Sequence, residues 1–205
     1  MADEVFDLEN EPPRKVNRGS VFAALTGRGD SDVSGDPEGS VAGMLRALVG
    51  SSPRTGDVDT KAAAEALGVS RRRVQAWLKA EREGRRPGMR SPTREKIVRR
   101  SRQAATTKRG RRAALRDVRT RPRRRIQPIK VRISGEQGPR RSGKGYARWR
   151  STDRDLTPMQ YEEMLAAYEE GGDDGVAAFL EDLWDSEYSA DWGMFTIDAI
   201  EIHNA

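Results

Sequence analysis

Residues 70–82 read SRRRVQAWLKAER and combine side chains that are suited to contact a DNA duplex. Guanidinium and amide groups hydrogen-bond to base edges in a major groove, and lysine and arginine neutralise phosphates. Apolar residues at helical spacing (Val74, Trp77, Leu78) predict that one helix carries these groups. The predicted DNA-contacting residues of this segment are Ser70, Arg71, Arg72, Arg73, Gln75, Lys79 and Arg82.

A second predicted helix precedes this one and would position it. Thr60 is the expected N-cap, and Gly68 can take the positive φ that ends a helix. Ser70 is the expected N-cap of the following helix. The spacing of glycine and apolar anchors predicts a helix-turn-helix, with a helical hairpin without a DNA role as the alternative.

Charge is strongly segregated along the 205 residues. Residues 1–50 carry a net charge of −4, residues 51–152 of +24 and residues 153–205 of −14. A stretch at +24 favours a nucleic-acid partner through counterion release, and a solvated arginine-rich surface is the alternative. The acidic C-terminal region could cover the basic region or bind a separate partner.

The segment after the helix-turn-helix is basic and poor in apolar residues. A helix is expected from residue 91 to about residue 118, lying along a DNA backbone and ordered on binding. Its predicted phosphate contacts, together with a second clamp that follows, are Arg94, Arg99, Arg100, Arg123, Arg124 and Arg125.

The C-terminal third predicts a small ββααβ module. Residues 129–133 and 146–150 read as strands around a turn-rich loop at 135–145, and two helices and a final strand over 195–202 follow. The expected fold class is mainly α with a small α+β C-terminal module. The expected domains are a disordered acidic leader (1–40), a helix-turn-helix domain (41–90), an arginine-rich basic helix or linker (91–125) and the α+β domain with acidic helices (126–205).

Several function classes are disfavoured by composition. The chain has no Cys, and its one His is His203, which excludes disulfides, Cys-based zinc fingers and His-dependent triads. The acidic runs are expected to be solvated, with no metal bound and no catalytic site. Without an apolar membrane span or a signal-like start, a cytoplasmic, nucleoid-associated protein is expected.

Three stretches follow one another along the chain: MLRALVG, TKAAAEALGVSRRRVQAWLKAEREGRRPGMRS and LTPMQYEEMLAAYEEGGDDGVAAFLEDLW. In that order the chain resembles the telomere terminal proteins of Streptomyces-type linear chromosomes and plasmids over about residues 41–205. The resemblance implies a protein primer: a side-chain hydroxyl accepts the first deoxynucleotide, and the protein stays covalently attached to the 5′ DNA end.

The implied partners are the ends of a linear replicon and a DNA polymerase, which would supply the deoxynucleotide and Mg²⁺. A telomere-associated DNA-binding protein and a homodimer are further open partners. The family's acceptor is a Thr before the Pro-Gln-Tyr helix. In this sequence Ser142 falls nearest, and Ser151 and Thr152 are the other candidates.

Two other functions stay open at this point. One is a helix-turn-helix regulator or replicon-maintenance protein that binds DNA non-covalently, with the C-terminal domain as a dimerisation or partner module. The other is an arginine-rich nucleoid or RNA-binding protein, which would bind without sequence preference and with a steep salt dependence.

Overall fold

A computed structural model describes residues 4–11, 13–120, 128–187 and 191–204. The chain is a mixed α+β protein with a cluster of helices and an antiparallel sheet. It divides into two compact units, which we call the helical unit (Leu25–Arg119) and the sheet unit (Met1–Ala24 with Thr120–Ala205). This division differs from the four successive segments expected from the sequence, because the sheet unit takes chain from both ends.

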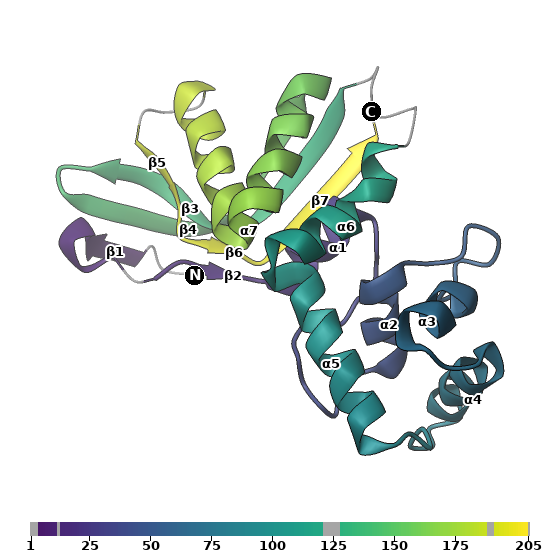
Figure 1. Cartoon of the computed structure of the whole chain (residues 1–205). Helices are drawn as coiled ribbons and strands as arrows, with labels where there is room; N and C mark the ends of the chain where they lie inside the picture. Colours follow the sequence, from purple (N-terminus) through teal and green to yellow (C-terminus); the bar gives the residue numbers. More distant parts are fainter. Residues whose placement is uncertain (1–3, 12, 121–127, 188–190, 205) are drawn as a thin grey trace. The chain divides into compact units, whose positions relative to one another are not determined.

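The helical unit contains α2 (Val41–Val49), α3 (Thr60–Leu67), α4 (Arg71–Arg82), α5 (Ser91–Thr106) and α6 (Lys108–Arg119). Figure 1 shows α5 running beside the group made by α2, α3 and α4. One apolar core joins α2, α3, α4 and α5, and its largest members include Met44, Leu45, Trp77 and Ile97. The helical spacing of Val41, Met44, Leu45, Leu48 and Val49 predicts a helix over residues 41–49, and α2 has these bounds.

The connection between α3 and α4 follows the predicted local chemistry. Gly68 ends α3 in the left-handed region, with φ 70° and ψ 40°. The Ser70 hydroxyl accepts a hydrogen bond from the Arg73 N–H at 3.3 Å and caps α4. The expected N-cap of α3 was wrong by one residue, since the Asp59 carboxylate accepts from the Lys61 and Ala62 N–H groups at 3.0 Å each.

The basic segment is not the single helix that the sequence predicted from residue 91 to about residue 118. Thr107 is extended, with φ −112° and ψ 142°, and separates α5 from α6. Both helices contribute buried side chains, among them Ile97 and Leu115. Gly110 allows the close approach of α6, because a Cβ there would lie 2.1 Å from the Gln103 carbonyl oxygen. Small residues thus let these helices pack despite a thin apolar stripe.

The sheet unit is built around the hairpin of β3 (Ile129–Arg141) and β4 (Lys144–Leu156). Within the described residues its sheet has the order β1-β4-β3-β5, and β7 (Ala199–Asn204) also pairs with β3. The helix α7 (Pro158–Glu187) covers one face of the sheet (Figure 1). Between α7 and β7 lie β5 (Trp192–Met194) and β6 (Thr196–Ile197). The single final strand predicted over 195–202 is therefore interrupted.

The first 24 residues belong to this unit, and the prediction of a disordered leader over 1–40 was wrong. They contain β1 (Glu4–Asp7), the 3-10 turn η1 (Leu8–Asn10), β2 (Lys15–Val16) and most of α1 (Arg18–Thr26). β1 pairs with the edge of β4, and β2 pairs with β6. These partners lie more than 130 residues away, so the local polar composition does not reveal them.

The β3–β4 hairpin is longer than predicted. The segment 135–145 was expected to be a loop, but the strands pair as far as Arg141 and Lys144. The turn is Ser142-Gly143, and both residues have positive φ values, 51° and 74°. Two such residues in succession are typical of the tight turn that matches the twist of paired strands.

Thr157, Pro158 and Gln160 predict a capped helix start, and Gly171-Gly172 predicts the end of that helix before a second one; α7 has both features. Thr157 and Gln160 form a capping box, in which the Gln160 N–H donates to Thr157 Oγ1 (3.2 Å) and the Thr157 N–H donates to Gln160 Oε1 (2.9 Å). Gly172 has φ 66° and ψ −140° and divides the helix into two parts. Trp184 and Tyr168, one from each part, are buried.

Candidate nucleic-acid interface

The helix α4 exposes a polar face. Val74, Trp77 and Leu78 are buried and hold α4 to the helical unit, as predicted. Since successive helix residues are rotated by about 100°, Arg72, Gln75, Ala76 and Lys79 share the opposite side, and all four are exposed. Arg71 and Arg82 lie on one flank of this face, and Arg73 lies on the other.

The exposed face is cationic over most of its length. Lys79 approaches Glu83 at 3.8 Å, and Glu83 follows the last helical residue. The hydrogen bond from the Arg85 guanidinium holds the pKa of the Glu83 carboxyl below its usual range. Glu83 therefore reduces the positive charge at the end of α4. At its start, none of the described carboxylates lies within ion-pair distance of Arg71 or Arg72, and Arg71 is hydrogen-bonded to Thr60.

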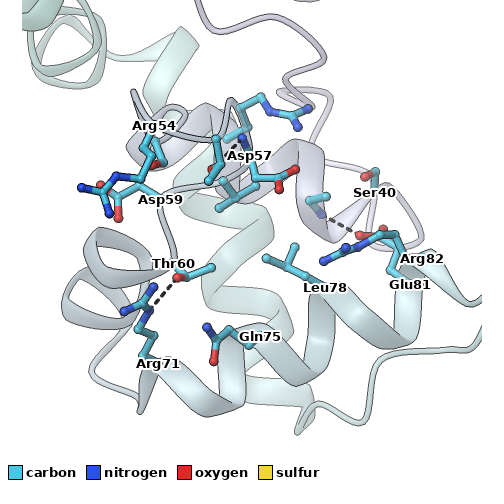
Figure 2. A pocket seen from close by; sticks show the side chains of 15 residues that line it. Ser40, Arg54, Asp57, Asp59, Thr60, Arg71, Gln75, Leu78, Glu81 and Arg82 are labelled. Atoms are coloured by element: carbon cyan, nitrogen blue, oxygen red, sulfur yellow. Dashed lines mark hydrogen bonds between the residues drawn. The ribbon is translucent and has the colours of Figure 1, made fainter.

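A groove of about 730 Å³ borders the Arg71 flank. Figure 2 shows α4 on one side of it and the segment between α2 and α3 on the other. The cations lining it are Arg46, Arg54, Arg71 and Arg82. The Arg71 guanidinium donates from Nε to Thr60 Oγ1 at 2.9 Å, which orients it along the groove (Figure 2).

Two of the carboxylates in this groove cap helices. Asp59 caps α3, as described above, and Glu81 accepts from the N–H groups of Val41 (2.7 Å) and Ala42 (2.8 Å) at the start of α2. A carboxylate at a helix N-terminus is stabilised by both the hydrogen bonds and the helix dipole. Their charges are therefore partly balanced by the helices. Asp57 also lines the groove, so its four arginines stand beside three carboxylates, two of which cap helices.

The structure places the predicted cations of α5 in different surroundings. The Arg100 guanidinium donates to the Ala66 carbonyl at the C-terminal end of α3, where Lys96 also donates to Leu67 at 2.9 Å. Arg94 donates to the Pro37 and Gly39 carbonyls. These groups stabilise the helical unit, whereas Arg99 is exposed. Arg123, Arg124 and Arg125 lie outside the described residues.

One further arginine of the helical unit is buried and serves the fold. Arg28 donates to the Ala47 carbonyl at 2.7 Å, near the end of α2, and its guanidinium lies 3.9 Å from the Asp117 carboxylate. Burial lowers the pKa of Arg28, and the charge of Asp117 opposes that effect. Some arginines of this chain thus stabilise the fold, and others are candidates for phosphate contacts.

The three candidate hydroxyls do not come together. Ser142 is exposed at the tip of the β3–β4 hairpin, between the exposed cations Arg141 and Lys144. Ser151 lies seven residues beyond Lys144, the first residue of β4, which corresponds to roughly 23 Å of extended strand. Ser151 and Thr152, as neighbours in a strand, point to opposite faces of the sheet.

Ser151 and Thr152 are both hydrogen-bonded. The Ser151 hydroxyl lies 2.7 Å from the Ser134 hydroxyl, and Thr152 donates to Gln137 Oε1 at 3.0 Å. Near Ser151, Arg132 donates two hydrogen bonds to Asp153, at 2.7 and 3.1 Å, which holds the pKa of Asp153 below its usual range. Asp153 is two residues from Ser151, on the same face of the strand, and its charge is balanced by Arg132 and by Lys130 at 3.9 Å.

Sequence reasoning missed Arg54 and Glu81. Arg54 stands alone in the motif-free stretch SSPRTGD, and only its place on the groove distinguishes it. Glu81 comes three residues after Leu78, the last of the apolar anchors of α4, and its sequence position is typical of a solvated carboxylate. Glu81 accepts hydrogen bonds from N–H groups that lie 39 and 40 residues earlier in the sequence. No local sequence pattern therefore indicates its role as a helix cap.

No protein-family model, curated protein or solved structure matches this chain. Over the described ranges, no helix is both long and apolar enough to cross a membrane. The same residues contain no group of three or more His, Asp or Glu side chains that could hold a metal ion.

Proposed function

We propose that the chain binds double-stranded DNA, with α3 and α4 acting as a helix-turn-helix and α4 lying in the major groove. The observation that carries the proposal is the exposed face of α4, on which Arg72, Gln75 and Lys79 stand opposite the buried Val74 and Trp77. Arginine and glutamine bind guanine and adenine edges, while lysine suits phosphate. The helical unit carries 23 Lys and Arg against 11 Asp and Glu, which favours the same partner.

The test begins with selection of duplexes from a random pool by the full chain. Fluorescence anisotropy then compares an enriched duplex with a scrambled one. Arg72→Ala should weaken binding to the enriched duplex by roughly 5- to 150-fold, the range of one bidentate base contact, with a smaller loss on the scrambled duplex.

Arg73→Ala is the matched control, since it removes the same charge from the other flank of the same helix. It should lower the affinity for both duplexes by similar, small factors. Equal losses for the two variants on both duplexes would contradict the placement of Arg72 at base edges.

We further propose that the chain is a terminal protein of a linear replicon, with Ser142 as the acceptor and a DNA polymerase as the partner. Ser142 Oγ would attack the α-phosphorus of a deoxynucleoside triphosphate. An Oγ–P bond forms, the bond between the α-phosphorus and the bridging oxygen breaks, pyrophosphate leaves, and the hydroxyl proton passes to a base of the polymerase or to water. The metal ions and the catalytic groups belong to that partner.

The support for Ser142 is its position. A hydroxyl at an exposed turn is accessible to an active site on another protein, and Arg141 and Lys144 beside it attract the triphosphate. In this proposal β3, β4, the two parts of α7 and the strands that follow form the ββααβ module that presents the hydroxyl. The nucleoid is the proposed location.

A further inference from the structure

The segment 51–58, between α2 and α3, forms a small hydrogen-bonded hairpin. Ser51 and Val58 make an antiparallel bridge, and the Ser52 N–H donates to the Asp57 carbonyl at 2.7 Å. The Gly56 N–H closes the turn on the Ser52 carbonyl at 2.9 Å. Val58 is 5% exposed and anchors the hairpin in the core of the helical unit.

Arg54 occupies the turn of this hairpin. It is exposed and lines the groove together with Arg71 and Arg82. Over the described residues, no carboxylate lies within ion-pair distance of Arg54, in contrast to Arg46, which approaches Asp30 at 3.6 Å. Figure 2 shows Arg54 on the opposite side of the groove from Arg71 and Gln75.

The position of this groove relative to α4 suggests what it holds. The exposed face of α4 is the part that would enter a major groove, and a sugar-phosphate strand borders a major groove on each side. The strand on the Arg71 flank would pass between α4 and the 51–58 hairpin. The hydrogen bonds of the hairpin place the backbone of Arg54 beside the groove before DNA binds, so binding needs to order only its side chain.

We propose that this groove binds the phosphate backbone that borders the contacted major groove, with Arg54 donating from the hairpin and Arg71 and Arg82 from α4. The inference rests on the proposed DNA binding by α4 and adds a second element to it. Such a contact contributes affinity on every sequence and no base preference.

The test measures the salt dependence of duplex binding by the full chain for Arg54→Ala, Arg54→Lys and Arg85→Ala. Loss of one phosphate contact reduces the slope of log K against log salt by about 0.9, which corresponds to about eightfold weaker binding near 0.1 M salt. Arg54→Ala should show both changes equally on the enriched and the scrambled duplex. Arg54→Lys should keep most of the slope, because it keeps the charge.

Arg85→Ala is the control for loss of one positive charge. Arg85 lies outside the groove and is already paired with Glu83, so its loss should change the slope less. Equal effects of Arg85→Ala and Arg54→Ala would overturn the groove assignment. An effect of Arg54→Ala on sequence preference alone would also overturn it, in favour of a base contact.

The failures of the two proposals are distinguishable. An Arg54→Ala variant with unchanged affinity and slope, tested beside an impaired Arg72→Ala variant, overturns the phosphate groove and leaves the role of α4 intact. A full chain that binds no duplex overturns both. Circular dichroism of Arg54→Ala should match that of the unmodified chain, because the side chain is exposed.

Discussion

At the scale of single residues, the three hydroxyls near the β3–β4 hairpin differ in what surrounds them. Ser142 stands at a turn between two cations, and none of the described residues takes a hydrogen bond from its hydroxyl. Ser151 and Thr152 are engaged with Ser134 and Gln137. A primer needs a hydroxyl that a polymerase can reach, so these differences favour Ser142.

We expect Ser142→Ala to abolish formation of a nucleotide adduct and to leave the fold unchanged. The reason is that the substitution removes the nucleophilic oxygen while the turn keeps Gly143 at its second position. The measurement is mass spectrometry of protein recovered from nuclease-treated host DNA, with thermal melting of the purified variant alongside.

Ser151→Ala is the matched control and should retain the adduct. An adduct that persists in Ser142→Ala would move the acceptor to another hydroxyl. Unmodified protein, recovered in good yield from internal DNA sites, would favour a non-covalent regulator instead.

At the scale of elements, helix ends in the helical unit are joined by side chains from other helices. Glu81 of α4 caps the start of α2, and Lys96 and Arg100 of α5 cap the end of α3. These contacts fix the helices relative to one another, because a helix end has unsatisfied N–H or carbonyl groups that must find partners. They also hold α4 in the orientation that exposes Arg72.

Glu81→Ala should lower the free energy of unfolding by about 1–3 kcal/mol, because two N–H groups at the start of α2 lose a charged acceptor. Glu81→Gln should recover part of the loss, since its amide oxygen can still accept. Urea denaturation of the full chain measures both.

Glu83→Gln is the control at the exposed end of the same helix, and we expect a change within about 0.5 kcal/mol. A Glu81→Ala variant as stable as Glu83→Gln would show that water satisfies the α2 N-terminus and that the carboxylate is dispensable.

At the scale of the whole molecule, the sheet unit is assembled from the two ends of the chain. Phe6 and Phe195 pack edge to face with centroids 4.9 Å apart, and Arg14 pairs with Glu181 at 2.5 Å. Glu181 also accepts from the Met194 N–H at 2.7 Å. The N-terminal residues therefore complete the unit that carries Ser142.

Deletion of residues 1–17 should destabilise the sheet unit and spare the helical unit. Loss of β1 exposes the edge of β4, and loss of Phe6 and Arg14 removes packing and an ion pair. Hydrogen exchange should show faster exchange in β3 and β4 and unchanged protection in α2 to α4. Equal losses of protection in both units would contradict the division of the chain.

Helix bounds, helix caps and exposed helix faces could be predicted from the sequence, because each depends on residues within about one helical turn. The bounds of α2 and the exposed face of α4 follow from apolar spacing, and Gly68, Ser70 and the Thr157–Gln160 box follow from capping chemistry. The predicted DNA face of α4 rests on these local features, so it could be derived before any coordinates.

The hydrogen bonds and strand pairings between residues far apart in the sequence could be identified only in the folded structure. Glu81 and the N-terminus of α2 are about 40 residues apart, and β1 pairs with a strand more than 130 residues away. In the folded chain, Arg54 lies beside α4 on the same groove. Arg94 and Arg100 donate hydrogen bonds to backbone carbonyls of distant segments. The physical reason is that such hydrogen bonds and strand pairings require only a suitable group in the right place, and no local spacing encodes where the folded chain brings that group.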